Sequence, residues 1–258
     1  MNQSPLLSIF VITHNESARL PEMLRAIAPL QQTPIFAELI VVDSGSIDGT
    51  REIAAKAGAR VLRRDWEGYG QQKSYAEGLC VAPWLLNLDA DEYLSVKAVE
   101  SIAALVQDPK AQDVYNLAIT IIKDERRSIF LAPINRTPRL YRRGKAFFAT
   151  DTVLDKVLPE QGATIGHIRA PVYHKTIESF PRLWEKLGQY NKQQITKRAK
   201  VNKWPNRWFV VPNALFFFLK HYFLRRMFAL GSYGFAYACI LTASRLMRDL
   251  ELCRLSKK

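Results

Sequence analysis

The first hundred residues alternate between short apolar runs and longer segments whose apolar side chains recur at helical spacing. The short runs predict strands over residues 7–13, 39–42, 59–62 and 84–88. The longer segments predict helices over residues 17–30, 48–57 and 71–80, with Asp48 as a cap and Gly58 as a stop. Because strands and helices alternate, we expect an α/β fold with a doubly wound, mainly parallel sheet.

Polar clusters follow three of the predicted strands at the point where each strand ends. They cover residues 13–16, 43–46 and 89–92. In sheets of this kind, ligands bind beyond the carboxyl ends of the strands. The three clusters are therefore expected on one rim of the sheet, around a common ligand.

The pattern is less regular after residue 100. Residues 114–122 and 139–142 are predicted strands, and Pro138 is interpreted as part of a loop. A helix with one apolar face is predicted from Phe180 onward. We expect a domain over residues 1–178 and a helical appendage over residues 179–258.

The appendage is aromatic and basic. Aromatic side chains crowd together from about Trp204, interrupted by Lys220, Arg225 and Arg226, and residues 227–244 carry no charge. An interfacial helix on anionic lipid is the preferred interpretation. The alternatives are packing within the protein or in a homo-oligomer, and a helix that spans the membrane.

The net charge of +13 over 258 residues is unevenly distributed. Residues 1–100 hold 9 Lys and Arg against 13 Asp and Glu, whereas residues 201–258 hold 10 against 2. Such asymmetry predicts a polyanionic partner: nucleic acid, anionic headgroups or a phosphorylated substrate, with a solvated basic surface as the alternative. Nucleic acid is the least favoured of these, because the sequence has no recognisable binding module and begins with an acidic third.

Cysteine usage and the start of the chain indicate a cytoplasmic protein. The three cysteines fit neither a disulfide framework nor a zinc pattern, which predicts a reducing compartment. Residues 1–13 lack the basic flank, apolar segment and cleavage site of a signal peptide.

Carboxylates at the end of the fourth predicted strand carry the strongest chemical signal. Asp89, Asp91 and Glu92 follow a buried run within four positions. Buried carboxylates are costly unless a cation or a proton offsets them. Two carboxylates one residue apart can hold a divalent metal that also binds a diphosphate.

A second signal is the turn after the second predicted strand. Asp43 could accept a hydrogen bond from a nucleobase or ribose, and Ser44 and Gly45 let the backbone approach a ligand. An ordinary strand–turn–helix connection with capping residues is the alternative.

Together, residues 9–16, 41–50 and 88–92 resemble the ordered motifs of family 2 glycosyltransferases, which are inverting, metal-dependent enzymes with a GT-A fold. The resemblance implies a GT-A catalytic domain that uses Mg²⁺ or Mn²⁺. It also implies a UDP-sugar site and a metal site. The nucleotide residues implied are Thr13, Asn15, Glu16, Asp43, Ser44, Gly45, Lys73 and Asp89, and the metal ligands implied are Asp91, Asp89 and His174.

Residues 89–92, 138–144, 218–222 and 231–235 resemble bacterial lipopolysaccharide-core glycosyltransferases, in particular enzymes that place β-linked glucose on inner-core heptose. This resemblance implies UDP-glucose as donor, a lipid-linked core acceptor and a peripheral location on the cytoplasmic face of the inner membrane. The alternatives are a polyprenyl-phosphate acceptor and a donor-binding scaffold without turnover.

An inverting reaction needs a general base on the acceptor side of the site. Asp155 is the first candidate and Asp151 the second, since residues 153–155 correspond to a Val-His-Glu-like triplet in relatives. Two departures from that triplet are Leu154 in place of histidine and the shorter Asp155. A surface ion pair between Asp155 and Lys156 is the alternative.

Three further side chains have two interpretations. His174 matches a late family histidine and is otherwise a structural hydrogen-bonder. Arg139 and Arg142 could bind acceptor phosphates through bidentate contacts, or they belong to a solvated face.

Overall fold

The computed structural model describes residues 5–122, 134–150, 156–175 and 179–256. The chain forms two compact units. The sheet unit comprises Met1–Thr120 and Asn135–His174, and the helical unit comprises Ile121–Ile134 and Lys175–Lys258. The expected boundary after residue 178 lies four residues later than the boundary in the structure, and residues 121–134 were expected in the first domain.

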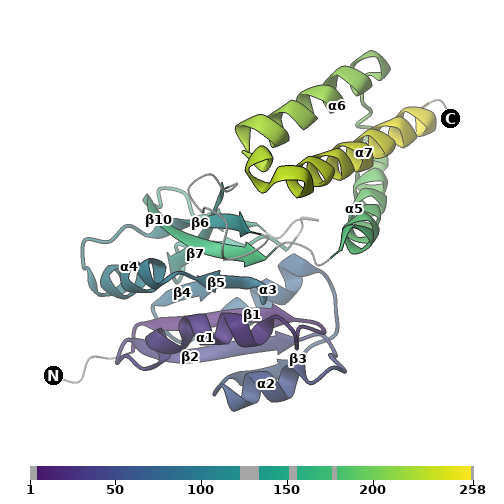
Figure 1. Cartoon of the computed structure of the whole chain (residues 1–258). Helices are drawn as coiled ribbons and strands as arrows, with labels where there is room; N and C mark the ends of the chain where they lie inside the picture. The colour runs from purple at the N-terminus through teal and green to yellow at the C-terminus, as the bar shows by residue number, and fades with distance from the viewer. Residues whose placement is uncertain (1–4, 123–133, 151–155, 176–178, 257–258) are drawn as a thin grey trace. The chain divides into compact units, whose positions relative to one another are not determined.

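The sheet unit is built on an eight-stranded sheet with the order β3-β2-β1-β4-β7-β6-β10-β5 (Figure 1). Strands β1 to β4 are parallel, and β7 runs antiparallel to β4. The strands are β1 Leu7–Thr13, β2 Phe36–Asp43, β3 Arg60–Arg63, β4 Trp84–Asn87, β5 Glu92–Leu94, β6 Val114–Ile122, β7 Ile134–Arg142 and β10 Ile165–Lys175. A two-stranded sheet pairs β8 Ala146–Phe148 with β9 Val157–Pro159. The expected α/β fold with a mainly parallel core is confirmed.

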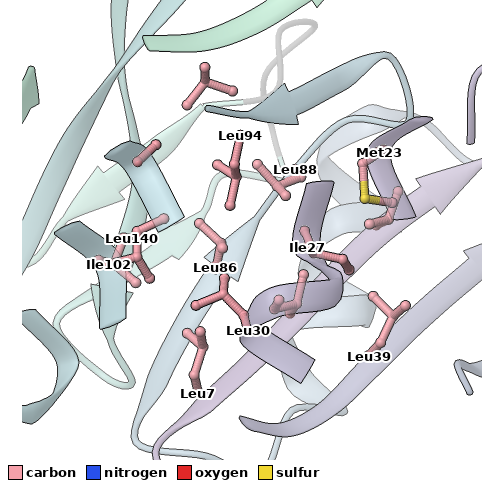
Figure 2. Packing of buried hydrophobic residues seen from close by; sticks show 14 of the residues in the cluster. Leu7, Met23, Ile27, Leu30, Leu39, Leu86, Leu88, Leu94, Ile102 and Leu140 are labelled. Carbon is pink, nitrogen blue, oxygen red and sulfur yellow. The ribbon is translucent and has the colours of Figure 1, made fainter. Parts of the chain in front are cut away.

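Helices cover both faces of this sheet, so alternate strand residues are buried on opposite sides. Leu7, Leu39 and Leu86 pack with Met23, Ile27 and Leu30 of α1 on one face (Figure 2). Phe10 and Ile40, on the other face, pack with Ala76 of α3. Burial on both faces explains why these strands are near-continuous apolar runs. The helices of this unit are α1 Leu20–Gln31, α2 Thr50–Lys56, α3 Tyr69–Gly78 and α4 Val96–Gln107.

Helices α1 and α2 begin later than sequence analysis predicted, for one physical reason. The backbone N–H groups of Glu16 and Ser17 donate to Thr50 Oγ1 at 2.8 Å and Asp48 Oδ2 at 3.0 Å. These bonds hold the two strand-end loops together in place of an extra helical turn. Asp48 is therefore a loop clamp, and Gly49, in a left-handed conformation with φ +85°, precedes α2.

Sequence analysis missed α4, β5, β8, β9 and β10 in the later part of the sheet unit. The start of α4 has a local signal, because Ser95 Oγ accepts a hydrogen bond from Ala98 N at 3.2 Å. Strand β7 is longer than predicted and contains Pro138, which sequence analysis assigned to a loop. Pairing of β7 with β4 covers only Leu140 to Arg142, so the missing N–H of Pro138 interrupts no bond to β4.

The helical unit contains α5 Phe180–Lys200, η2 Arg207–Phe209, α6 Val210–Leu219, η3 Lys220–Leu224, η4 Met227–Leu230 and α7 Gly231–Leu255. Helix α5 runs along α7: Phe180 stacks on Tyr233, and Asn191 Nδ2 donates to the Ser244 carbonyl oxygen at 2.8 Å. Among the described residues, the segment Met227–Leu255 is long and apolar enough to cross a membrane, by length and composition alone. One such helix is weak support for a membrane span, because core helices of soluble proteins can be equally long and apolar.

Two glycines of the helical unit give a matched test of its packing. A Cβ at Gly234 would lie 1.8 Å from the Met227 carbonyl oxygen, whereas a Cβ at Gly188 would have nothing within 4 Å. We expect Gly234→Ala to lower the free energy of unfolding by about 1–3 kcal/mol through overpacking. Gly188→Ala should raise it by up to about 1 kcal/mol, because alanine favours the helix. Urea unfolding followed by circular dichroism measures both, and effects of the same sign would contradict the packing described.

Candidate active site

The polar ends of β1, β2 and β4 meet on one rim of the sheet. Thr13 pairs with Asp43 across β1 and β2, and Phe10 pairs with Asn87 across β1 and β4. The clusters beyond these strand ends are therefore neighbours, as sequence analysis expected.

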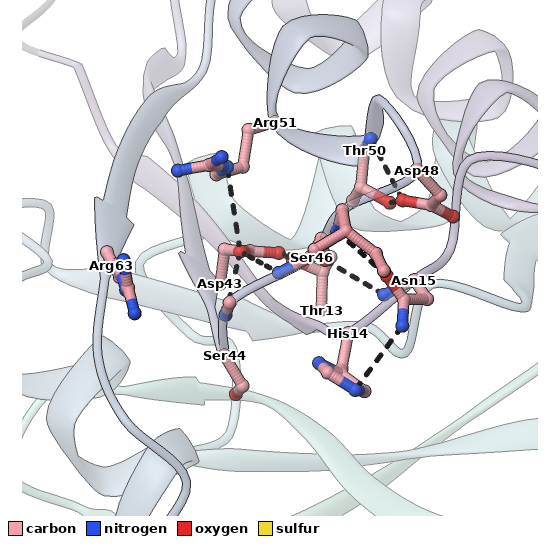
Figure 3. Close-up of polar contacts among 12 residues, drawn as sticks. Thr13, His14, Asn15, Asp43, Ser44, Ser46, Asp48, Thr50, Arg51 and Arg63 are labelled. Atoms are coloured by element: carbon pink, nitrogen blue, oxygen red, sulfur yellow. Dashed lines mark hydrogen bonds and ion pairs between the residues drawn. The ribbon is translucent and has the colours of Figure 1, made fainter.

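Asp43 organises the first part of this rim (Figure 3). Its side chain is fully buried, and its two carboxylate oxygens accept hydrogen bonds from Thr13 Oγ1 at 2.9 Å, Gly45 N at 3.0 Å and Ser46 N at 2.8 Å. Ser46 Oγ donates a fourth, very short bond. A carboxylate has about four acceptor positions. In this structure three of them accept bonds from Gly45 and Ser46 of its own loop and one from Thr13 of β1, so Asp43 fixes the loop backbone and ties it to β1.

The β1 loop is fastened to the β2 loop through Asn15. Asn15 N donates to Ser46 Oγ at 2.8 Å, and Asn15 Oδ1 accepts from Ile47 N at 3.0 Å. Asn15 has a left-handed backbone with φ +55°, a conformation that asparagine tolerates well. The carboxylate of Glu16 lies 3.1 Å from the Arg19 guanidinium. Asn15 thus shapes the loop that presents Glu16.

Helix α3 reaches the same rim through two adjacent side chains. Gln72 Nε2 donates to Ser44 Oγ at 2.8 Å and to the Arg64 carbonyl oxygen at 3.1 Å. Lys73 Nζ lies 2.6 Å from Asp89 Oδ1, and its side chain is only 1% exposed. Gln72 is fully buried. The sequence does not identify it as a residue of the rim, because a single polar side chain in a helix forms no recognisable motif.

A buried charge cluster fixes Asp89. Arg139 Nη2 lies 2.7 Å from Asp89 Oδ2 and 2.6 Å from Glu92 Oε1, while Arg139 Nη1 donates to Asn87 Oδ1 at 2.7 Å. Glu92 Oε2 accepts from Asp89 N at 3.1 Å. Two cations, Lys73 and Arg139, therefore balance two carboxylates, as buried charges require.

The pKa shifts follow from these contacts. Burial opposes ionisation of Asp89, but the charges of Arg139 and Lys73 outweigh it and lower the pKa of this carboxyl. Burial dominates at Glu92 and raises its pKa despite the Arg139 charge. Asp89 is therefore the firmly ionised member of the cluster.

Asp91 lies apart from this cluster, with His174. Asp91 Oδ2 and His174 Nε2 are 3.2 Å apart, and both side chains are about one quarter exposed, at 25% and 26%. Burial opposes both charged forms, yet the hydrogen bond between them lowers the pKa of Asp91 and raises the pKa of His174. His174 stands near the end of β10, opposite Glu92 of β5, so pairing of distant strands brings it to the rim.

These residues fit a metal site of only two protein ligands. Among the residues that the structure describes, no group of three or more His, Cys, Asp and Glu side chains could hold a metal ion. Asp91 and His174 can bind one as a carboxylate and an imidazole, with diphosphate oxygens completing the sphere. Asp89 fits this role poorly, because both its oxygens are engaged by Lys73 and Arg139. Asp89 was expected to be a metal ligand, and this geometry argues against that role.

The family comparison agrees with this arrangement. The glycosyl transferase family 2 model matches residues 8–160, which include all of these motifs except His174. The chain belongs to glycosyl transferase family 2.

Two relatives align with this glycosyltransferase over most of its length. An uncharacterized glycosyltransferase of Rickettsia typhi is 33% identical over 98% of this chain and 88% of its own length. The lipopolysaccharide core biosynthesis glycosyltransferase LpsC of Rhizobium meliloti is 25% identical over 93% of this chain and 91% of its own.

Solved structures share the fold of the glycosyltransferase. S. aureus TarS (residues 1–349) matches with a TM-score of 0.51 and 16% identity, over 96% of this chain and 91% of that one. Mannosyl-3-phosphoglycerate synthase of Rubrobacter xylanophilus has a TM-score of 0.51 and 14% identity, over 77% and 75%. The expected GT-A fold is confirmed.

The two arginines expected to bind the acceptor do not fit that role. The Arg139 guanidinium is enclosed by Asn87, Asp89 and Glu92, so this side chain belongs to the charge cluster around Asp89. Arg142 pairs with Trp84, at the start of β4 and so at the opposite end from the rim, and its guanidinium lies 4.4 Å from the Trp84 ring centroid. The sequence shows only two arginines three positions apart in one strand, and this pattern does not reveal that their surroundings differ.

The expected general bases, Asp151 and Asp155, lie outside the described residues. The residues on either side are well fixed, because Ala149 N donates to the Lys156 carbonyl oxygen at 3.0 Å. Gln71 Nε2 also donates to the Thr150 carbonyl oxygen at 2.9 Å, and a Cβ at Gly70 would lie 2.2 Å from the Ala149 carbonyl oxygen. The helix that carries Lys73 therefore packs directly against Ala149 and Thr150, which precede the expected bases in the sequence.

Arg139 and Arg142, three residues apart on β7, give a matched test of the charge cluster. We expect Arg139→Gln to lower the free energy of unfolding by about 3–5 kcal/mol, because Asp89 and Glu92 lose a buried partner. Arg142→Gln should cost only about 0.5–1 kcal/mol, the contribution of one ring contact. Urea unfolding measures both, and equal costs would argue against a buried cluster that depends on Arg139.

Proposed function

We propose that this glycosyltransferase moves glucose, with inversion, from UDP-glucose to heptose in a lipopolysaccharide core. The core acceptor is supported by the motifs of residues 138–144 and 231–235, and by the similarity to LpsC, whose name states that pathway. A uridine nucleotide is supported by the loop around Asp43. TarS, which shares the fold, has been solved with UDP and with UDP-GlcNAc.

One observation carries this proposal: ionised Asp89, held by two buried cations, lies two residues from the Asp91–His174 pair. The buried cluster is already balanced in charge. The Asp91–His174 pair supplies a carboxylate and an imidazole that can share a divalent cation with a diphosphate. That arrangement suits a donor whose leaving group is a nucleoside diphosphate.

Each part of the rim then has a role in donor binding. Thr13, Glu16 and the Asp43 loop receive the uridine, with the backbone of Ser44 and Gly45 close to it. Asp89 faces the ribose, and Lys73 keeps Asp89 ionised and oriented. Asp91 and His174 would hold Mg²⁺ or Mn²⁺, which neutralises charge on the departing UDP.

The acceptor side supplies the base. The Asp155 carboxylate takes the proton of the acceptor hydroxyl, with Asp151 as second candidate. The hydroxyl oxygen forms a bond to C1 of the sugar while the bond from C1 to the phosphate oxygen breaks. UDP leaves from the opposite face, so the configuration at C1 inverts.

Asp91→Asn tests the metal role. Transfer should fall by about 10²–10³-fold, since an amide binds a divalent cation weakly, and the remaining activity should respond little to added Mn²⁺. The control is Asp65→Asn, whose carboxylate is 93% exposed and has no role in the proposed donor or metal binding. Initial rates of transfer from UDP-glucose are measured during a metal titration. An Asp91→Asn enzyme with the metal response of the wild type would refute the role.

Asp155→Asn tests the base. Single-turnover transfer should fall by about 10²–10⁴-fold, whereas UDP-glucose binding measured by calorimetry should stay unchanged. Asp151→Asn should reduce transfer much less. A small effect of Asp155→Asn on transfer to a core acceptor would remove this residue as base. A small effect with polyprenyl phosphate as the active acceptor would favour that alternative, because the acceptor is already anionic.

A further inference from the structure

The outer face of α6 and η3 is an exposed apolar ridge. We define this ridge by six side chains that are 43–76% exposed: Trp208, Val211, Leu215, Phe216, Leu219 and Phe223. Four of them recur every four residues from Val211 to Phe223, so they line one side of the helix. Monomeric soluble proteins rarely leave so many large apolar side chains together on one surface.

The other face of α6 is already occupied. Val210, Ala214 and His221 are buried, and the Arg245 guanidinium of α7 lies 4.6 Å from the Phe217 ring centroid. Asn213 is the one polar residue of α6. A helix that is apolar on both sides needs a second apolar environment for its outer face.

Positive charge lies next to the ridge, in a part of the sequence that contains no acidic residue. Residues 175–258 hold 17 Lys and Arg against 4 Asp and Glu, whereas residues 1–174 hold 20 of each. The entire net charge of the chain therefore belongs to residues 175–258. No Asp or Glu occurs in residues 201–248, and Lys220, Arg225 and Arg226 are exposed next to the ridge. This combination complements an anionic lipid surface and would repel a second copy of the same region.

Helix α7 is poorly suited to cross a bilayer because of its partner α5. Asn191 Nδ2 donates to Ser244 Oγ at 2.8 Å, and Arg248 Nη1 donates to Gln194 Oε1 at 2.7 Å. Helix α5 also carries Lys192, Lys197 and Lys200 on its exposed side. A spanning α7 would draw these polar and charged groups into hydrocarbon, which is strongly unfavourable.

We propose that the helical unit binds an anionic membrane in the plane of one leaflet, with the apolar ridge in the acyl–headgroup boundary. Lys220, Arg225 and Arg226 contact anionic headgroups, and α7 remains on the same side of the bilayer. This inference deepens the proposed function by specifying how the enzyme reaches a lipid-linked acceptor.

Sedimentation with vesicles of phosphatidylcholine, with or without phosphatidylglycerol, tests the surface on the full chain. Wild-type protein should bind the anionic vesicles and be released by high salt. Lys220→Gln with Arg225→Gln should weaken binding about 25-fold, at about fivefold per cation. Leu215→Glu with Leu219→Glu should weaken it at least tenfold. Val96→Glu is the matched control, since Val96 is an apolar side chain of α4 that is 74% exposed. Circular dichroism confirms that each variant is folded.

Three outcomes would overturn the inference. They are equal binding to neutral and anionic vesicles, retention of the protein after alkaline carbonate extraction, and a stable dimer that Leu215→Glu with Leu219→Glu dissociates. Transfer to a water-soluble core acceptor is measured on the same proteins. Ridge variants that lose vesicle binding should keep this activity. Wild-type protein that binds vesicles but transfers to no core acceptor would refute the proposed function and leave the membrane surface intact.

Discussion

The ionised carboxylate of Asp89 is the constraint around which the catalytic unit is organised. Its own side chain is 32% exposed, but the two cations that hold it, Lys73 and Arg139, are buried and persist only with opposite charges against them. Lys73 comes from α3 and Arg139 from β7, so the requirement joins a helix, the parallel core of the sheet and an antiparallel strand at one point. Loss of either cation would disturb the architecture and the rim together.

Because Asp89 is neutralised, the two aspartates of the Asp-x-Asp motif, Asp89 and Asp91, have different roles. One carboxylate is committed to the protein, and the other, Asp91, shares only a hydrogen bond with a partly exposed histidine. The motif thus combines a rigid anchor with a group that can exchange its proton partner for a metal. Asp43 on the neighbouring loop is likewise committed to the protein. Its fully buried carboxylate fixes the backbone that a nucleotide would approach.

Sequence reasoning identified the parallel core because β1 to β4 carry their own signals: apolar runs bounded by turns. It failed for β8, β9 and β10, which are defined by pairing rather than by composition. The site divides in the same way. The carboxylates Asp43, Asp89 and Asp91 were evident as residues at strand ends. The partners Asn87 and Gln72, and the real surroundings of Glu92, Arg139 and Arg142, depend on contacts between segments as far apart in the sequence as those of Trp84 and Arg142. No local pattern contains that information.

The distribution of charge gives the two units opposite physical characters. At the carboxylate-rich rim of the sheet unit, the two central cations, Lys73 and Arg139, are buried against Asp89 and Glu92. The helical unit places Lys220, Arg225 and Arg226 at the surface, near exposed aromatic side chains. The same residue types therefore serve short-range orientation in one unit and long-range attraction in the other. The short-range contacts tolerate salt because they are buried, whereas salt weakens the long-range attraction.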